Sequence, residues 1–227
     1  MTLFGFVLGF AIFIGAILHE THEATLFIHE HADELRSEYR RSEELGRLSD
    51  RTVEVLKRSG GFRLLLSKDV GGYQAHPRDF REEVYGTDPD VIVASPYAPF
   101  GRATAVDGGY RLTGRWPYST GTDHSDWVIL GGLVVDEATG APDAGAPEVR
   151  HFVLPKGTDY EIVDGTWNVL GLGGTGSKDV QMTDTFVPAY RTLLEAEVAD
   201  GTCAALQQPG NPLYQMRFLT MFPAAIN

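Results

Sequence analysis

The pattern of hydrophobic and polar positions divides the chain into a helical first part and a β-rich second part. Within residues 28–48, Ile28, Ala32, Leu35 and Tyr39 recur at spacings of four, three and four, and charged residues fill many of the positions between them. This spacing follows one face of an α-helix. The first part of the chain is therefore predicted to contain an amphipathic helix.

A second helix is expected directly afterwards. Ser49 or Asp50 provides a good N-cap, and the glycine pair at 60–61 provides a stop. Val53 and Leu56 are predicted to lie on its buried face.

From Val91 onward the pattern is typical of strands. Asp107–Gly109 lies between alternating residues, which is a strong hairpin signal. Residues 127–135 are almost continuously apolar, so we expect a strand that is buried on both faces. Further strands are predicted at 149–154, 160–163 and 180–187. The sequence thus predicts an α+β protein, with an N-terminal helical segment followed by an antiparallel β-barrel or sandwich.

The predicted hairpin leads into the most informative segment of the chain. Its second strand ends in a cluster of aromatic, hydroxyl and glycine residues, namely Trp116, Tyr118, Ser119, Thr120 and Gly121. This combination suits a flat heterocycle with polar edges, because the aromatic ring can pack on one face while the hydroxyls bond the edge atoms.

A glycine motif further along the chain does not predict a dinucleotide site. Gly171, Gly173 and Gly176 satisfy the G-x-G-x-x-G spacing, but residues 178–183 alternate like a strand. A dinucleotide site needs a helix at that position, so that the helix N-terminus meets the pyrophosphate. We therefore interpret these glycines as a loop between strands, and we do not expect NAD(P)H to bind this chain directly.

No metal site is predicted. The run at 19–23, HETHE, spaces its histidines three apart, whereas a zinc protease helix needs a spacing of four, and no third ligand is evident. The alternative for this histidine- and glutamate-rich segment is a solvated, pH-sensitive face. Cys203 has no Cys or His companion at metal spacing and is interpreted as a buried or idle thiol.

Composition and charge limit the classes of partner that are expected for this chain. The chain has 227 residues, 43% of them hydrophobic, and a net charge of −12, which disfavours nucleic acid. The uncharged run Leu3–Leu18 is shorter than the roughly 20 residues that span a bilayer. It predicts a buried helix or an oligomer contact, with a membrane anchor or a segment foreign to the rest of the chain as alternatives. We expect a cytoplasmic protein.

Three blocks of sequence resemble a known family. They are residues 58–72, residues 83–135, and residues 167–191 with the wording WNVLGLGGTGSKDV. They resemble the acyl-CoA dehydrogenase superfamily, and within it the flavin-dependent aromatic monooxygenases of the secosteroid A-ring hydroxylase and 4-hydroxyphenylacetate hydroxylase type. The wording WPYSTG at 116–121 favours the hydroxylases over the dehydrogenases.

The resemblance implies an N-terminal helical domain, a central β-domain and a C-terminal four-helix bundle. The family carries further helices between Phe80 and Arg81, and its bundle would begin near Asn227, so part of the helical domain and the bundle are expected to be absent. The expected divisions are an apolar segment of unclear origin, a partial helical domain, a flavin-contacting β-domain and the start of a C-terminal helical region, at 1–28, 29–90, 91–190 and 191–227.

The resemblance also implies which residues meet a flavin. The expected cofactor contacts are Ser95, Tyr97, Gly101, Trp116, Tyr118, Ser119 and Thr120. The candidate catalytic residues are Ser119, Thr120 and His124. A neutral histidine could hold a proton for a phenol or a flavin adduct. The alternative for Asp123 and His124 is a surface turn that Asp123 caps.

The function implied is that of the oxygenase component of a two-component monooxygenase. A separate NAD(P)H–flavin reductase would supply reduced flavin, FADH2 or FMNH2, and dioxygen would provide the oxygen atom for a phenolic or steroid-derived ring. The alternatives are an acyl-CoA dehydrogenase-type oxidoreductase, for which no glutamate base can be assigned, and a non-catalytic flavin-binding or interaction fragment. The apolar segments at 3–18 and 218–226 predict a homo-oligomer.

Overall fold

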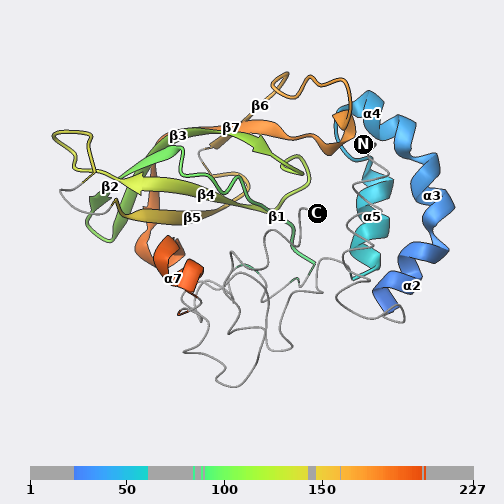
Figure 1. Cartoon of the computed structure of the whole chain (residues 1–227), viewed down its shortest axis with the longest axis horizontal. Helices are drawn as coiled ribbons and strands as arrows, with labels where there is room; N and C mark the ends of the chain where they lie inside the picture. Colours follow the sequence, from blue (N-terminus) through green and yellow to red (C-terminus); the bar gives the residue numbers. More distant parts are fainter. Residues whose placement is uncertain are drawn as a thin grey trace.

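The computed structural model describes residues 23–60, 84, 88, 90–142, 147–158, 160–200 and 202. A group of helices lies at one end of a twisted sheet (Figure 1). The helices of this group are α2 (Glu23–Glu30), α3 (Ala32–Ser37), α4 (Tyr39–Leu45) and α5 (Asp50–Arg58), and a further helix, α7 (Glu195–Asp200), lies apart from them. The apolar run Leu3–Leu18, Cys203 and the segment at 218–226 lie outside the described residues.

The strands follow one another through the second part of the chain, with two short 3-10 helices among them. The strands are β1 (Val93–Ala94), β2 (Gly101–Val106), β3 (Gly109–Ser119), β4 (Trp127–Val134), β5 (Val149–Pro155), β6 (Tyr160–Val163), β7 (Lys178–Pro188) and β8 (Thr192–Leu194). The 3-10 helices are η2 (Gly173–Thr175) and η3 (Ala189–Arg191). The predicted α+β class is therefore confirmed.

The helix expected over 28–48 is a succession of three short helices. Its interruptions lie beside side chains that bond carbonyl groups of the preceding turn. The Nδ1 atom of His31 lies 2.8 Å from the Phe27 carbonyl oxygen, and the Ser37 hydroxyl donates to the Glu34 carbonyl at 2.7 Å. Such local bonds compete with the helical ladder and bend it. Gly46 then ends α4 with a φ of 62°.

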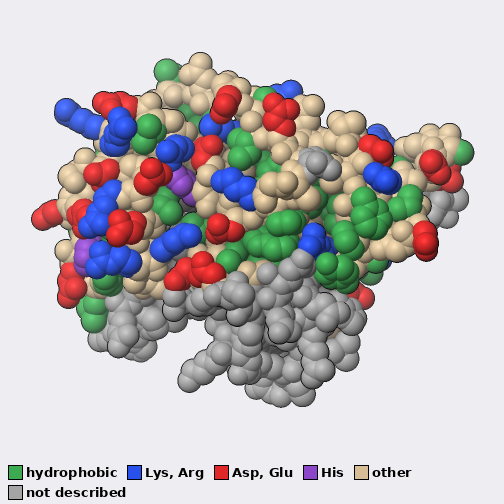
Figure 2. Space-filling view, turned by 180° about the vertical axis from the view of Figure 1, so that it is seen from behind, with side chains coloured by type: hydrophobic (Ala, Val, Ile, Leu, Met, Phe, Trp, Pro, Cys, Tyr) green, Lys and Arg blue, Asp and Glu red, His purple; other side chains and the backbone are tan. Residues whose placement is uncertain are grey.

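Helix α5 begins where the sequence predicts. The Ser49 hydroxyl accepts a hydrogen bond from the Thr52 backbone N–H at 3.1 Å. The buried face consists of Thr52, Val55 and Leu56, whereas Val53 is only half-buried. The predicted buried face was therefore right for Leu56 and wrong for Val53, because the helix is rotated slightly from the predicted orientation. Charged side chains crowd the outer surface of α3–α5 (Figure 2), where several ion pairs link them.

The strands form one mixed sheet in the order β6-β7-β3-β2-β4-β5-β8, with β1 beside β4. The predicted hairpin is confirmed, because Asp107 and Gly108 connect β2 to its antiparallel neighbour β3. The expectation of an antiparallel barrel or sandwich is corrected. The sheet is not closed, and β4 runs parallel to both β1 and β2. The chain passes from the end of β3 to the far side of β2, so β4 takes the direction of β2.

The main core lies on one face of this sheet, around Trp116. The Trp116 side chain is fully buried, and its indole N–H donates to the Gly131 carbonyl at 2.6 Å. Gly101 and Gly114 lie directly against the ring, and an added Cβ at either position would come within 3 Å of it. Small residues on β2 and β3 therefore make the room that the indole occupies.

Strand β4 is buried on both faces, as its continuous apolar run predicts. Val128 and Leu130 belong to the main core, together with residues of β2, β3, β5 and β7. Trp127 and Ile129 point to the opposite face, where they pack with Val153 of β5. Among the described residues, no helix is long and apolar enough to cross a membrane.

The glycine motif forms a loop between β6 and β7, as expected. Leu172 and Gly176 adopt left-handed backbone conformations on either side of η2, with φ of 65° and 56°. A strand follows the motif instead of a helix. The interpretation that it is not a dinucleotide-binding turn is therefore consistent with the fold.

Replacing Gly101 by Ala is expected to destabilise the protein. The added Cβ would lie 2.4 Å from the Trp116 ring, which is fully buried and cannot move without disturbing the core. Overpacking of this kind costs about 1–3 kcal/mol in the free energy of unfolding, which urea denaturation would measure. Gly171→Ala is the control, because nothing lies within 4 Å of its added Cβ. Equal stability of the two variants would contradict this account of the core.

Candidate functional site

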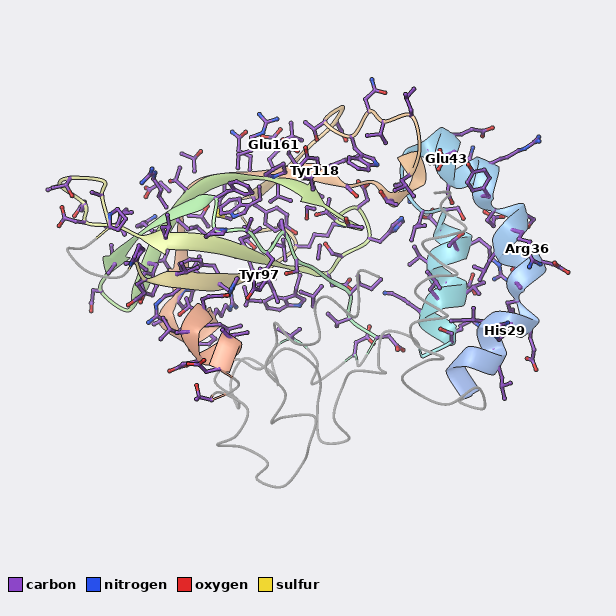
Figure 3. All side chains as sticks on the ribbon, viewed as in Figure 1. His29, Arg36, Glu43, Tyr97, Tyr118 and Glu161 are labelled. Atoms are coloured by element: carbon purple, nitrogen blue, oxygen red, sulfur yellow. The ribbon has the colours of Figure 1, made fainter. Side chains whose placement is uncertain are left out.

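The candidate site lies where β3 leaves the core. The pairing of β3 with β7 shifts in register between Trp116 and Ser119, and Tyr118 has a φ of 64°. A positive φ is uncommon for a bulky residue. This irregularity turns Tyr118 outward, so that it is 70% exposed and meets the edge of Trp167 at 6.2 Å between ring centroids. Figure 3 shows Tyr118 on the outer side of the sheet.

The neighbouring hydroxyls divide between the interior and the surface. Thr120 is exposed, and its hydroxyl lies 2.9 Å from the Ser177 hydroxyl. Ser119 and Thr122 are fully buried, and their hydroxyl oxygens have no hydrogen-bond partner among the described residues. Unsatisfied buried hydroxyls are rare and suggest a partner that these residues do not supply. The strand end thus offers an exposed ring, one accessible hydroxyl and further hydroxyls behind them.

Two of the predicted cofactor contacts lie in the core. Trp116 is fully buried, so its ring is not available to a ligand at the surface. Gly101 is buried beneath that ring. The sequence pattern identifies an aromatic residue at the strand end, but it does not show on which side of the strand each ring lies. Tyr118 is the aromatic residue that this end of the strand exposes.

His124 connects the turn after β3 to the helices. Its Nε2 atom lies 2.7 Å from the Leu48 carbonyl oxygen, and its Nδ1 atom lies 4.0 Å from the Asp50 carboxylate. Burial lowers the pKa of His124 below its ordinary value, although the bond to Leu48 opposes the shift. The neutral form of the ring therefore fits this position, where Nε2 also lies 3.0 Å from the Arg47 guanidinium. The ring joins the sheet to the α4–α5 turn, and a catalytic role for His124 stays a prediction.

Further polar contacts link β7 to the turn after β3, and α4 to the η2 loop. Lys178 bonds the carboxylates of Asp123 and Asp164, each at 2.9 Å. The Glu43 carboxylate of α4 accepts the backbone N–H of Gly174 at 3.2 Å. Asp123 therefore pairs with β7, rather than capping an isolated surface turn. These contacts give the strand end and the η2 loop a fixed position relative to the helices.

Tyr97 belongs to a separate cluster. Its hydroxyl donates to Glu195 at 2.6 Å, and its ring stacks on His151 at 4.4 Å between centroids. The His151 Nε2 atom contacts the same carboxylate oxygen, and its Nδ1 atom is buried without a partner among the described residues. Figure 3 shows Tyr97 and Tyr118 on different sides of the sheet. Ser95 is exposed nearby on the loop after β1.

The sequence-predicted residues thus do not form a single cluster. Tyr118, Ser119 and Thr120 lie together, whereas Tyr97 lies against β5 and α7. Sequence reasoning missed Thr175 and Ser177, because both stand in the glycine loop 55 or more residues away from Thr120. Pairing of β3 with β7 is the signal that could have identified them. It places Lys178 opposite Ser119, and the residue before Lys178, Ser177, therefore lies beside Thr120. Among the described residues, no group of histidine, cysteine and acidic side chains could hold a metal ion.

Comparison with known proteins shows which proteins this chain is similar to. The chain is 36% identical to a pigment production hydroxylase of Rhodococcus erythropolis, over 91% of this chain and 61% of that protein. It is 34% identical to the flavin-dependent monooxygenase oxygenase subunit HsaA of Rhodococcus jostii, over 85% of this chain and 58% of that protein. This chain is homologous to the oxygenase components of flavin-dependent monooxygenases. It spans about three fifths of the length of these two relatives.

Solved structures agree with this oxygenase homology. The 3-HSA hydroxylase from Rhodococcus sp. RHA1 superposes with a TM-score of 0.80 at 31% identity, over 92% of this chain and 62% of that one. XiaF from a Streptomyces species, solved with FADH2 and glycerol, superposes with a TM-score of 0.74 at 28% identity, over 90% of this chain and 57% of that one. No family model matches the chain.

The stability of the protein is expected to fall as the pH drops below about 6.5, the ordinary pKa of histidine. Because folding lowers the pKa of His124, the unfolded chain takes up this proton first, and the stability is fully present only above the unfolded value. The loss should continue down to the folded pKa of His124. His124→Gln keeps a donor for the Leu48 carbonyl but does not titrate.

Urea denaturation of both proteins at pH 8 and pH 5.5 would measure this effect. The other histidines contribute equally to both proteins, so the difference between the two pH dependences isolates His124. An identical pH dependence in the two proteins would show that His124 is not the titrating group.

Proposed function

We propose that this chain is the β-domain and part of the helical domain of an oxygenase component in a two-component flavin-dependent monooxygenase. The substrate would be a phenolic or steroid-derived aromatic ring. The observation that carries the proposal is the irregular end of β3, where Tyr118 is turned outward beside Trp167 and an accessible hydroxyl. The identity of 34–36% to a hydroxylase and a monooxygenase subunit supports it.

The residues at this strand end fit a flavin. An isoalloxazine ring is flat and apolar on its faces, and its edges carry nitrogen and oxygen atoms that need hydrogen-bond partners. The exposed ring of Tyr118 and the half-buried ring of Trp167 suit the faces, and the Thr120 hydroxyl suits an edge atom. When bound, a reduced flavin supplies the electrons with which dioxygen is activated. The complex of XiaF with FADH2 favours FADH2 over FMNH2.

Different residues of the chain would then have different roles in flavin binding. Tyr118 and Thr120 would contact and orient the ring, and Trp167 would limit the access of water from one side. Trp116 would support this strand end from the core without touching the ligand. Ser95 and the loop that Tyr97 holds would supply further contacts to the flavin, because the family resemblance indicates this segment as well.

The partners follow from this chemistry. The chain lacks a dinucleotide-binding turn in its glycine loop, so a separate NAD(P)H–flavin reductase would deliver the reduced flavin. Dioxygen and a small aromatic molecule would be the other substrates. We also propose a homo-oligomer, because an uncharged apolar run such as Leu3–Leu18 of the sequence is typical of an oligomer contact. A cytoplasmic location agrees with a supply of reducing equivalents from NAD(P)H.

The binding proposal predicts that Tyr118→Ala weakens the binding of reduced flavin. Loss of an aromatic contact costs about 0.5–1.5 kcal/mol, which is roughly a twofold to twelvefold rise in Kd. Anaerobic titration with FADH2 and with FMNH2, followed by fluorescence, measures this change. Tyr190→Ala is the matched control, because Tyr190 is also an exposed tyrosine but lies on η3. Equal Kd values for the two variants would contradict the placement of the site.

The catalytic proposal is tested with a flavin reductase, NADH, air and a set of simple phenols. Hydroxylated product that depends on this chain is the expected result. Flavin binding with no product from any phenol would support the non-catalytic alternative. Oxidation of an acyl-CoA thioester would support the dehydrogenase alternative instead.

A further inference from the structure

Three hydroxyl groups form a continuous row behind the exposed edge of the candidate site. The Thr120 hydroxyl oxygen lies 2.9 Å from that of Ser177, which in turn lies 2.9 Å from that of Thr175. The Thr175 hydroxyl donates to the Leu172 carbonyl at 2.9 Å. Thr175 and Ser177 are buried, whereas Thr120 is exposed. The row therefore runs from the Leu172 carbonyl to the surface of the site.

The carbonyl at the inner end determines the direction of every hydrogen bond in the row. A carbonyl can only accept, and each hydroxyl has one proton to donate. Thr175 gives its proton to Leu172, so the bond between Thr175 and Ser177 must use the Ser177 proton. Ser177 then has no proton left for Thr120, and the bond between them must use the Thr120 proton. The Thr120 oxygen consequently presents only lone pairs to the outside.

The inner end of the row is firmly held. The Leu172 carbonyl also accepts the Trp167 indole N–H at 3.0 Å and the Thr175 backbone N–H at 3.1 Å. The Glu43 carboxylate binds the next turn of the loop through the backbone of Gly174. Reversal of the row would leave the Thr175 hydroxyl without its carbonyl partner in a buried position, which is unfavourable.

We propose that Thr175 and Ser177 are positioning residues that make the Thr120 hydroxyl a hydrogen-bond acceptor toward the ligand. The inference rests on the proposed flavin site. The N5 atom of a flavin is an acceptor in the oxidised ring and carries a hydrogen in the reduced ring. If N5 faces Thr120, a hydroxyl that can only accept would bond N5 of the reduced ring and repel N5 of the oxidised ring. The row makes this site selective for the redox state of the flavin.

The experiment compares the Kd values of reduced and oxidised FAD for each variant, by anaerobic titration. Ser177→Ala and Thr175→Val each free one proton in the row, so that Thr120 can also donate. The ratio of the oxidised to the reduced Kd should fall roughly threefold to tenfold in both variants, the effect of one hydrogen bond of altered polarity. Thr175→Ser keeps the row complete and should restore the wild-type ratio.

Ser125→Ala is the matched control. Ser125 is a buried serine in the same turn, but its hydroxyl donates to the Thr122 carbonyl outside the row. Its ratio should equal that of the wild type. Because each ratio compares two ligands on one protein, a general loss of stability affects both Kd values and does not mimic the expected change.

The outcomes separate this inference from the proposed function. Wild-type binding of reduced flavin with unchanged ratios in Ser177→Ala and Thr175→Val would overturn the positioning role and leave the flavin site intact. An equal loss of affinity for both redox states would also overturn it, since the row would then only connect the η2 loop to β3. Failure of the wild-type chain to bind either form of flavin would contradict the site itself, and the inference with it.

Discussion

The packing of Trp116 against two glycines is the constraint on which the rest of the structure depends. Gly101 on β2 and Gly114 on β3 leave room for the indole, and its N–H bonds the Gly131 carbonyl on β4. One side chain therefore fixes three neighbouring strands at a single point. With this point fixed, the register of β3 is determined, and so is the place where its last residues leave the core.

The candidate site results from the way in which β3 ends. A regular strand would continue to alternate between core and solvent, but the register shift and the positive φ of Tyr118 change its course. Tyr118 and Thr120 reach the surface, while Ser119 remains buried between them. The turn that follows is attached to the helices through His124 and Leu48. The exposed ring and hydroxyl are thus supported on both sides by buried contacts.

The polarity of the site depends on a segment that is remote in the sequence. The pairing of β3 with β7 brings the glycine loop beside the strand end, and the loop contributes the hydroxyls of Thr175 and Ser177. The same loop is held by α4 through Glu43. The helical part, the loop and the strand end are therefore joined by direct contacts at this end of the sheet.

The sequence alone determined the features that depend on neighbouring residues. The hairpin at 107–108, the strand at 127–134 with both faces buried, and the strand after the glycine motif were predicted correctly, because turn chemistry and periodicity are local properties. Only the tertiary structure decided that Trp116 is a core residue, that His124 contacts Leu48 and that Ser177 bonds Thr120. Periodicity tells which residues share a face, but the pairing of distant strands decides which face is buried and which side chains meet.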